Sequence, residues 1–258
     1  MQFSIPVFLR LCSRSVLLTG AIALTLISLL THTPAQAQNA PGARQRGGAT
    51  YIKFEPPALG NAPGGRARGG ASRGECPTVT QPLTALVPTI NGSVGGLTGT
   101  DHPTFWFYVP YALTADHPAE FVLLDQHNKY VYQTTLIGGQ NPDTGILGVT
   151  LPDTLTLTAG QSYQWVFMVN CEIDNPIFTR GSIQKITLNA PLAQQIAQAA
   201  PLEKARLYAE HGIWFDALTT LAGLKTDQPT DPAIAAAWKS LLESVDLADV
   251  ADKPFVRQ

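Results

Sequence analysis

The sequence has few charged residues, few cysteines and only one long apolar run, and each shortage narrows what the protein can be. Charged residues make up 14% of the 258 residues, and the formal net charge is −2. A balance this weak predicts no electrostatic partner for the chain as a whole. After the first 30 residues, no segment is long and apolar enough to span a bilayer as a helix.

Signature motifs of common enzyme classes are also missing. There is no Gly-x-Ser-x-Gly nucleophile elbow, and the glycine-rich stretch 92–99 lacks the Gly-Lys-Ser/Thr ending of a phosphate loop. We interpret 92–99 as a flexible loop between strands. Acidic residues that might form a hydrolytic pair occupy positions typical of turns. They are Asp125, Asp143, Asp153 and Asp174. We therefore predict no catalytic residue and no enzymatic activity.

Histidines are too scattered to indicate a metal site. His102 and His117 each lie in an Asp-His-Pro tripeptide, and imidazole beside carboxylate can bind zinc. An aromatic strand of roughly 20–25 Å separates the two tripeptides, at ~3.3 Å per residue. His127 and His211 lie further along the chain. We expect these histidines to be polar loop residues, with no bound metal or cofactor.

The first 37 residues have the order of a secretory signal peptide. Arg10 and Arg14 precede an uncharged apolar run over 16–30, and Ala35-Gln36-Ala37 fits a small-x-small cleavage site. The run is shorter than the ~20 residues of a membrane-spanning helix. We predict cleavage after Ala37, which leaves a soluble chain in the periplasm or outside the cell. An uncleaved membrane anchor is the alternative.

Two cysteines remain after residue 37, Cys76 and Cys171. Exported proteins tend to pair their cysteines because their compartment is oxidising. We therefore expect a Cys76–Cys171 disulfide, with two buried free thiols as the alternative.

Residues 38–75 are rich in Gly, Arg and Pro and are predicted to be a flexible linker. They hold too few large apolar residues to offset the entropy of the chain, and 51–54 is the only candidate for an ordered patch. The segment is basic, so we hypothesise weak contact with acidic envelope glycans, with a solvated tether as the alternative and no nucleic acid after export. The arginines concerned are Arg44, Arg46, Arg66, Arg68 and Arg73.

Short strands separated by turn residues fill residues 76–189. The expected strands are 83–87, 105–109, 120–124, 130–135, 145–151, 155–157, 162–170 and 181–188. This spacing predicts a β-sandwich domain. The pattern from Leu155 through Gly160 and Tyr163 to Trp165 is similar to the strand–turn–strand of immunoglobulin-like domains. Tyr163 would stand at the corner and Trp165 in the core.

Residues 190–258 are predicted to be α-helical and to pack on the sandwich. Helices are expected over 192–200, 202–211 and 213–225, and Asp231-Pro232 predicts the start of a fourth. The spacing from Tyr208 through Gly212 to Leu221 resembles one tetratricopeptide-type unit, and no second copy follows. We favour a docked helical hairpin over a peptide-binding surface.

Four consecutive aromatics, Phe105 to Tyr108, stand in a chain that is 8% aromatic. Alternation places Phe105 and Phe107 on one face of a strand and Trp106 and Tyr108 on the other. One face must line the core. We expect the C-terminal helices to cover the other, with an exposed ligand platform as the alternative. The candidate binding or packing platform is Trp106, Tyr108, Tyr111 and Trp214.

Several stretches together resemble domain-of-unknown-function family 928 of exported cyanobacterial proteins. They are Gly69–Cys76, Leu83–Pro88, Pro103–Tyr111, Tyr163–Trp165 with Cys171, and Trp214–Leu218. The resemblance implies a secreted or periplasmic setting and a two-part architecture, and it supplies no substrate and no functional residues.

These observations predict an exported, non-enzymatic envelope protein that acts by binding another protein. A carbohydrate- or cell-wall-binding module is the alternative. Exposed aromatics beside polar groups in a shallow groove would favour a glycan, whereas a broad apolar patch would favour a protein partner.

Overall fold

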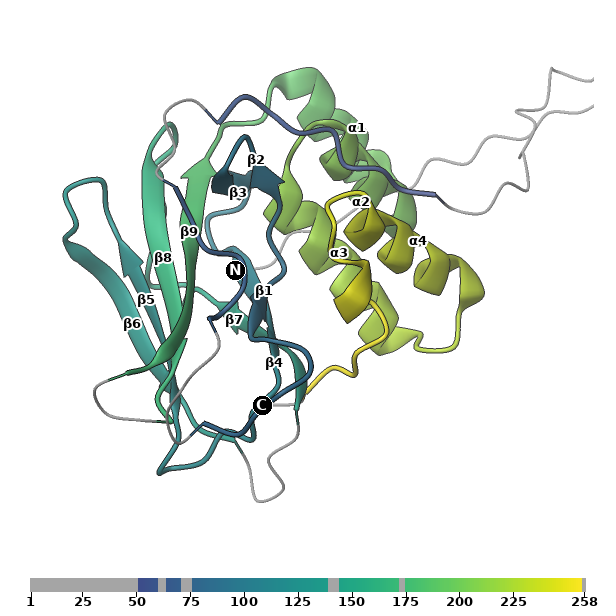
Figure 1. Cartoon of the computed structure of the whole chain (residues 1–258). Coiled ribbons are helices and arrows are strands. Elements are labelled where there is room, and N and C mark those ends of the chain that lie inside the picture. The colour runs from purple at the N-terminus through teal and green to yellow at the C-terminus, as the bar shows by residue number, and fades with distance from the viewer. Residues whose placement is uncertain (1–50, 60–63, 71–75, 139–143, 172–174, 257–258) are drawn as a thin grey trace, which may run out of the picture. The chain divides into compact units, whose positions relative to one another are not determined.

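A computed structural model describes residues 51–59, 64–70, 76–138, 144–171 and 175–256 (Figure 1). All of them belong to one compact unit, residues 47–258. The predicted signal peptide and the predicted linker up to residue 50 lie outside the described residues. None of the described helices is long and apolar enough to cross a membrane.

The described strands form two sheets, and the helices follow them in the chain. The smaller sheet has the order β1-β4-β7 and the larger the order β2-β3-β9-β8-β5-β6. Neighbours are antiparallel except β3 and β9, which are parallel. The strands are β1 (Thr84–Ala85), β2 (Thr89–Ile90), β3 (Ser93–Thr98), β4 (Thr104–Val109), β5 (Ala119–Leu124), β6 (Tyr130–Leu136), β7 (Gly145–Thr150), β8 (Ser162–Val169) and β9 (Ile177–Lys185).

Aromatic side chains from both sheets meet in one core. Phe105 and Phe107 of β4 are fully buried, and Phe107 stacks on Phe167 of β8 with ring centroids 4.1 Å apart. Phe105 contacts Phe121 of β5 at 4.8 Å. Such ring pairs stabilise a core beyond the area that they bury. The sequence left open which face of this strand lines the core, and it is the face of Phe105 and Phe107.

The prediction that residues 92–99 form a flexible loop is wrong, because they contain strand β3. β3 pairs with β2 and, through its second half, with β9. Its glycines admit close neighbours. A Cβ at Gly96 would lie 2.8 Å from the Cβ of Trp214, and one at Gly95 would lie 2.9 Å from the carbonyl oxygen of Ser182. Glycine in this strand therefore reflects close packing rather than freedom of the backbone.

Residues 155–157 were predicted to be a strand, and this is also wrong. Leu155 N donates to the Pro152 carbonyl at 2.9 Å in a turn, and Leu157 is buried. Thr158 N donates to the Tyr163 hydroxyl at 2.9 Å. The segment is therefore bound to β8 through a side chain and not through the backbone hydrogen bonds of a sheet. The sequence pattern suggested a strand because leucine is buried in this turn. Tyr163 itself lies at the start of β8, as its second residue.

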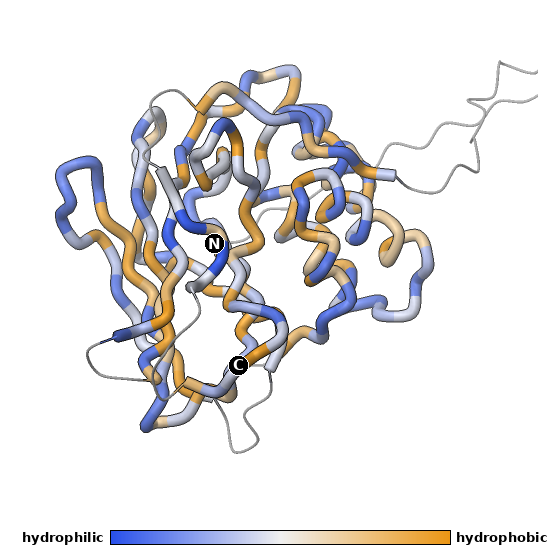
Figure 2. The backbone as a smooth tube through the Cα atoms, in the orientation of Figure 1, coloured by the Kyte–Doolittle hydropathy of each residue, from blue (hydrophilic) through white to orange (hydrophobic). Residues whose placement is uncertain are grey.

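β5 and β6 form the predicted hairpin. One carboxylate oxygen of Asp125 accepts hydrogen bonds from the backbone N–H groups of His127 at 2.8 Å and Lys129 at 2.9 Å. Asn128 takes a φ of 61°, a conformation that asparagine tolerates in turns. The tip of this hairpin is hydrophilic, whereas β5 is largely hydrophobic (Figure 2).

The predicted helices are confirmed to within a few residues. They are α1 (Ala190–Gln198), α2 (Pro201–Glu210), α3 (Trp214–Asp227) and α4 (Pro232–Glu243), followed by the 3₁₀ turn η1 (Ala248–Val250). The Asp231 side chain accepts from Ala233 N at 2.7 Å, so the predicted acid–proline start works as a cap. Gly212 takes a φ of 72° between α2 and α3, which supplies the turn of the hairpin.

Helix α3 docks the helical hairpin on the strands (Figure 1). It packs against β3 and β4, and it buries Trp214, Leu218 and Leu221 almost completely. Helix α3 thus joins the helices to the strands through buried apolar side chains.

Part of the predicted linker belongs to the core, so that prediction is wrong for residues 51–59 and 64–70. Ile52 and Phe54 are buried, which contributes about 1.5–3 kcal/mol for each apolar side chain. Their backbone N–H groups donate to hydroxyls near the end of α4, Ile52 to Ser240 at 2.9 Å and Phe54 to Ser244 at 3.1 Å. Helix α4 thus fixes this segment, and its composition alone did not show that.

Residues 66–69, which we call the strap, join the edges of both sheets. Arg66 pairs with Arg180 of β9 through backbone hydrogen bonds of 2.8 and 3.0 Å. Further along, Gly69 N donates to the Leu83 carbonyl at 2.7 Å, beside β1. The strap therefore extends the smaller sheet and the larger sheet at once.

Candidate functional site

A groove lies beside Trp106 at the smaller sheet. It lies between β4, β7, the end of α3 and residues 252–256, and it encloses about 640 Å³. The C-terminal segment forms one wall by pairing with β7, since Ile146 N donates to Pro254 O at 2.7 Å and Val256 N to Ile146 O at 2.8 Å. We call this cavity the Trp106 groove.

Trp106 is held rigidly at the groove. Its indole N–H donates to Thr219 Oγ1 of α3 at 3.1 Å, and its ring meets Phe255 edge-on at 5.6 Å. Gly148 gives the ring room, because a Cβ there would lie 2.9 Å from Trp106 Cζ3. An aromatic fixed in this way loses little conformational entropy when a ligand binds.

Polar groups surround the two aromatic rings. Thr104 and Thr150 share a hydrogen bond of 2.8 Å between their hydroxyls on the adjacent strands β4 and β7. Lys225, Lys253 and Asp252 also line the groove. The groove therefore offers stacking surface, hydroxyls and a small excess of positive charge.

The predicted platform is not one surface in the structure. Tyr108 and Tyr111 are each only 7% exposed, and the Lys253 amine lies 5.1 Å above the Tyr108 ring. Trp214 is fully buried, with its indole N–H donating to the Leu86 carbonyl at 2.8 Å. Trp106 is the member of the set that lines the groove, so the other three are packing residues.

Sequence reasoning missed the groove's other walls. Phe255, Lys225 and Asp252 carry no local motif. Phe255 and Asp252 reach the groove because residues 252–256 return to β7, and Lys225 reaches it from the last turn of α3. The aromatic character of Phe255 near an otherwise polar end is the one local signal that might have drawn attention to it.

A smaller pocket of about 180 Å³ adjoins the groove at Thr104 and contains the buried acid Asp216. Asp216 stands in the first turn of α3 and is 8% exposed. Its carboxylate accepts from Thr98 Oγ1 at 2.8 Å and from Gly99 N at 3.1 Å. The acid thus clamps α3 to the connection between β3 and β4.

Two further polar residues support the same connection. The Lys185 amine lies 3.0 Å from Asp101 and also donates to the Gly99 carbonyl. His102 places Nδ1 3.4 Å from Asp153, while its Nε2 is buried without a hydrogen-bonding partner among the described residues. These contacts stabilise the connection between β3 and β4, so we assign both residues a structural role.

Burial raises the pKa of the Asp216 carboxyl, although the bonds from Thr98 and Gly99 and the charge of Lys185 oppose the rise. The folded state then holds the proton more tightly than the unfolded chain. Asp216 therefore adds stability at low pH. That contribution is lost as the pH rises from the ordinary pKa of an aspartic acid, about 3.9, through the raised pKa of Asp216 in the folded state.

We expect Asp216→Asn to gain stability relative to the wild type as the pH rises through this window, because the variant lacks the titration. Urea unfolding at a series of pH values measures the difference. Asp249→Asn is the matched control, since the hydrogen bond from Arg68 lowers the pKa of Asp249 and the difference should run the opposite way. Equal pH profiles for the two variants would contradict the assignment.

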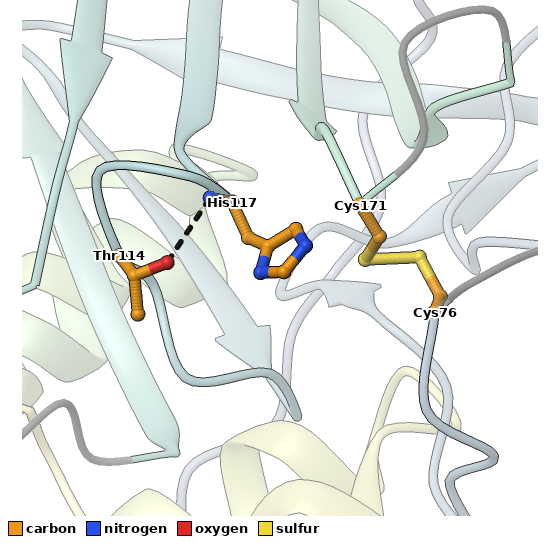
Figure 3. The surroundings of a disulfide bond; sticks show 4 residues. All are labelled: Cys76, Thr114, His117 and Cys171. Atoms are coloured by element: carbon orange, nitrogen blue, oxygen red, sulfur yellow. Dashed lines mark hydrogen bonds between the residues drawn. A yellow bond between two sulfur atoms is a disulfide. The ribbon is translucent and has the colours of Figure 1, made fainter.

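Cys76 and Cys171 form the expected disulfide, with Cα atoms 5.1 Å apart (Figure 3). It ties the start of the strand region to the residue that follows β8 by two positions. The imidazole of His117 points toward this bond, and His117 N donates to Thr114 Oγ1 at 3.0 Å. Within the described residues, no three His, Cys, Asp or Glu side chains come together as metal ligands would.

Of the arginines predicted to touch glycans, two lie in the described residues. Arg68 makes a two-pronged ion pair with Asp249 at 2.7 and 3.0 Å, so its charge is used within the fold. Arg66 is exposed and lies over the Phe178 ring at 4.9 Å. Arg44, Arg46 and Arg73 lie outside the described residues.

The body is thus a mixed β/α unit, two sheets with docked helices, that carries an aromatic groove at one sheet. The family model described as Domain of Unknown Function (DUF928) matches residues 68–255, and the chain belongs to this family. The family resemblance seen in the sequence is confirmed.

The remaining comparisons add little. A comparison with curated proteins gave no match. Among solved structures, a β-glucuronidase from Parabacteroides merdae shares 17% identity over 32% of this chain, with a TM-score of 0.23. The chain spans 10% of that structure's length.

Proposed function

We propose that this chain is an exported, non-enzymatic binding protein of the cell envelope, and that the Trp106 groove takes a carbohydrate. The observation that carries the proposal is a fixed, half-buried indole in a groove with hydroxyls and amines around it. A cavity of about 640 Å³ falls in the range of small-ligand sites. Sugars suit such a site because one face of the ring stacks on an aromatic while the hydroxyls take hydrogen bonds.

The charges at the groove indicate which sugars fit best. Lys225 and Lys253 stand against the single carboxylate of Asp252. We therefore propose an acidic glycan, whose carboxylate or phosphate would meet the amines. Arg44, Arg46 and Arg73 remain proposed as a second, weaker contact with the same polymer.

Export is supported by two independent features. The disulfide is of the kind that persists in oxidising compartments, and the first 37 residues have the order of a signal peptide. We propose a periplasmic or extracellular location.

We also propose that the two sheets form an immunoglobulin-like sandwich. Tyr163 supports this, since its hydroxyl bonds to the backbone five residues upstream, as the tyrosine of such a corner does. The fully buried Trp165 beside it is a second point of support.

A different protein as the ligand, the hypothesis that the sequence favoured, has less support. The large apolar side chains that are well exposed in the described residues are Tyr51, Tyr130 and Ile137. Tyr51 stands alone, and Tyr130 and Ile137 are separated by the length of β6, whereas a broad partner surface presents a contiguous apolar patch.

Trp106→Ala is expected to weaken glycan binding by roughly tenfold or more, the equivalent of about 1.4 kcal/mol, because the stacking surface is lost. Binding to arrays of neutral and acidic oligosaccharides, followed by titration calorimetry with the best of them, measures this. Tyr51→Ala is the control, since Tyr51 is 61% exposed and outside the groove. Equal losses in both variants, or no binding to any array member, would reject the proposal.

A further inference from the structure

β6 is the outer strand of the six-stranded sheet and carries an open edge. It pairs with β5 on one side, and no described residue pairs with its other side. An open edge presents alternate N–H and C=O groups without partners, and it is a template for another strand.

The chain covers the long edges elsewhere in its described part. The strap pairs with β1 and with the first half of β9, and residues 254–256 pair with β7. The far edge of the larger sheet is β2, which has two residues, whereas β6 has seven. Among the described residues, β6 is therefore the long edge that stays open.

The composition of β6 does nothing to repel another strand. Residues 130–138 read Tyr-Val-Tyr-Gln-Thr-Thr-Leu-Ile-Gly, with no charge and no proline. Charged residues and proline are the usual devices that protect an edge from pairing. Tyr130 and Ile137, at the two ends of this strand, are 67% and 58% exposed.

The strand is complementary to itself when it is reversed. An antiparallel pair centred on Thr134 sets Tyr132 opposite Leu136 and Gln133 opposite Thr135 of the second copy. In β6, Val131 is an extra residue between Tyr132 and Tyr130, which pair with consecutive residues of β5. Because of this shift, Tyr130 takes the place of Val131 and comes opposite Ile137 of the second copy. The two exposed apolar side chains of one copy would thus cover those of the other, as a two-fold interface requires.

We propose that two copies of this chain associate through antiparallel pairing of their β6 strands about a two-fold axis at Thr134. The pairing joins two six-stranded sheets into one continuous sheet. It is independent of the proposed function, because the Trp106 groove lies on the other sheet.

The test is the mass of the isolated full-length protein and its variants by light scattering and sedimentation. The wild type is expected at twice the mass of one chain. Gln133→Lys/Thr135→Lys should be monomeric at the same concentrations, since each introduced lysine would face one on the other copy. A single copy tolerates both, because Glu120 lies across from Thr135 and already accepts a hydrogen bond from Gln133.

Ser162→Lys/Gln164→Lys is the matched control on the same outer face. It adds the same charge to β8, which is paired on both sides, and it should remain a dimer. Thr134→Cys gives a second readout, because opposite strands place such residues within disulfide distance. It should form an oxidant-dependent cross-linked dimer, and Ser162→Cys should not. A monomeric wild type, a dimeric β6 variant, or a dimer in which Thr134→Cys fails to cross-link would overturn the proposal.

Discussion

Replacing Cys76 and Cys171 together by alanine is expected to lower the free energy of unfolding by about 4–5 kcal/mol. The disulfide closes a separation of 95 residues, and a loop of that size gains much freedom in the unfolded chain when the bond is absent. The loss is a large part of the total for a domain of this size. Denaturant unfolding under non-reducing conditions measures it.

Unfolding in the presence of a reductant is the control for this double variant. Wild-type protein unfolded with reductant present should lose the same stability, and the double variant should not respond to reductant. Unchanged unfolding of the double variant would mean that the bond carries little of the fold's stability.

Trp214→Ala is expected to cost about 3–5 kcal/mol and to loosen the helices from the strands. Trp214 is fully buried, meets Phe54 edge-on at 5.0 Å, and lies against Gly96 of β3. Its removal leaves a cavity and deprives the Leu86 carbonyl of its hydrogen-bond donor. Denaturant unfolding gives the cost, and limited proteolysis shows whether residues 190–256 become accessible.

Two variants separate the causes. Trp214→Phe keeps most of the packing and loses the hydrogen bond, so we expect a smaller cost of about 1–3 kcal/mol. Tyr51→Ala changes an exposed aromatic and should stay within about 0.5 kcal/mol of the wild type. If Trp214→Ala were as stable as Tyr51→Ala, the docking role of Trp214 would be wrong.

Local signals explain which elements the sequence could predict. Asp231-Pro232 and Gly212 act through neighbours in the chain, so the helix boundaries followed from them. Alternation in 162–170 predicted β8 because one face of that strand is buried along its length.

Features that depend on distant partners escaped prediction. β3 reads as a loop because Gly95 and Gly96 make room for Ser182 and Trp214, which are far along the chain. The burial of Ile52 depends on a helix that begins 180 residues later. Alternation in β4 placed Trp106 on the face opposite Phe105 and Phe107, yet the groove itself depends on the return of residues 252–256 to β7.

The hydrogen bonds between residues 52–68 and residues 240–249 have a consequence for how the protein reaches its native state. Ile52 bonds to a residue 188 positions away, Phe54 to one 190 away and Arg68 to one 181 away. Contacts of such high sequence separation slow folding, because the closure entropy is lost before the contacts form. For the export that we propose, in which the amino end crosses the membrane first, residues 52–68 cannot complete these contacts until α4 has emerged. This order favours translocation of the unfolded polypeptide and late, cooperative folding on the far side.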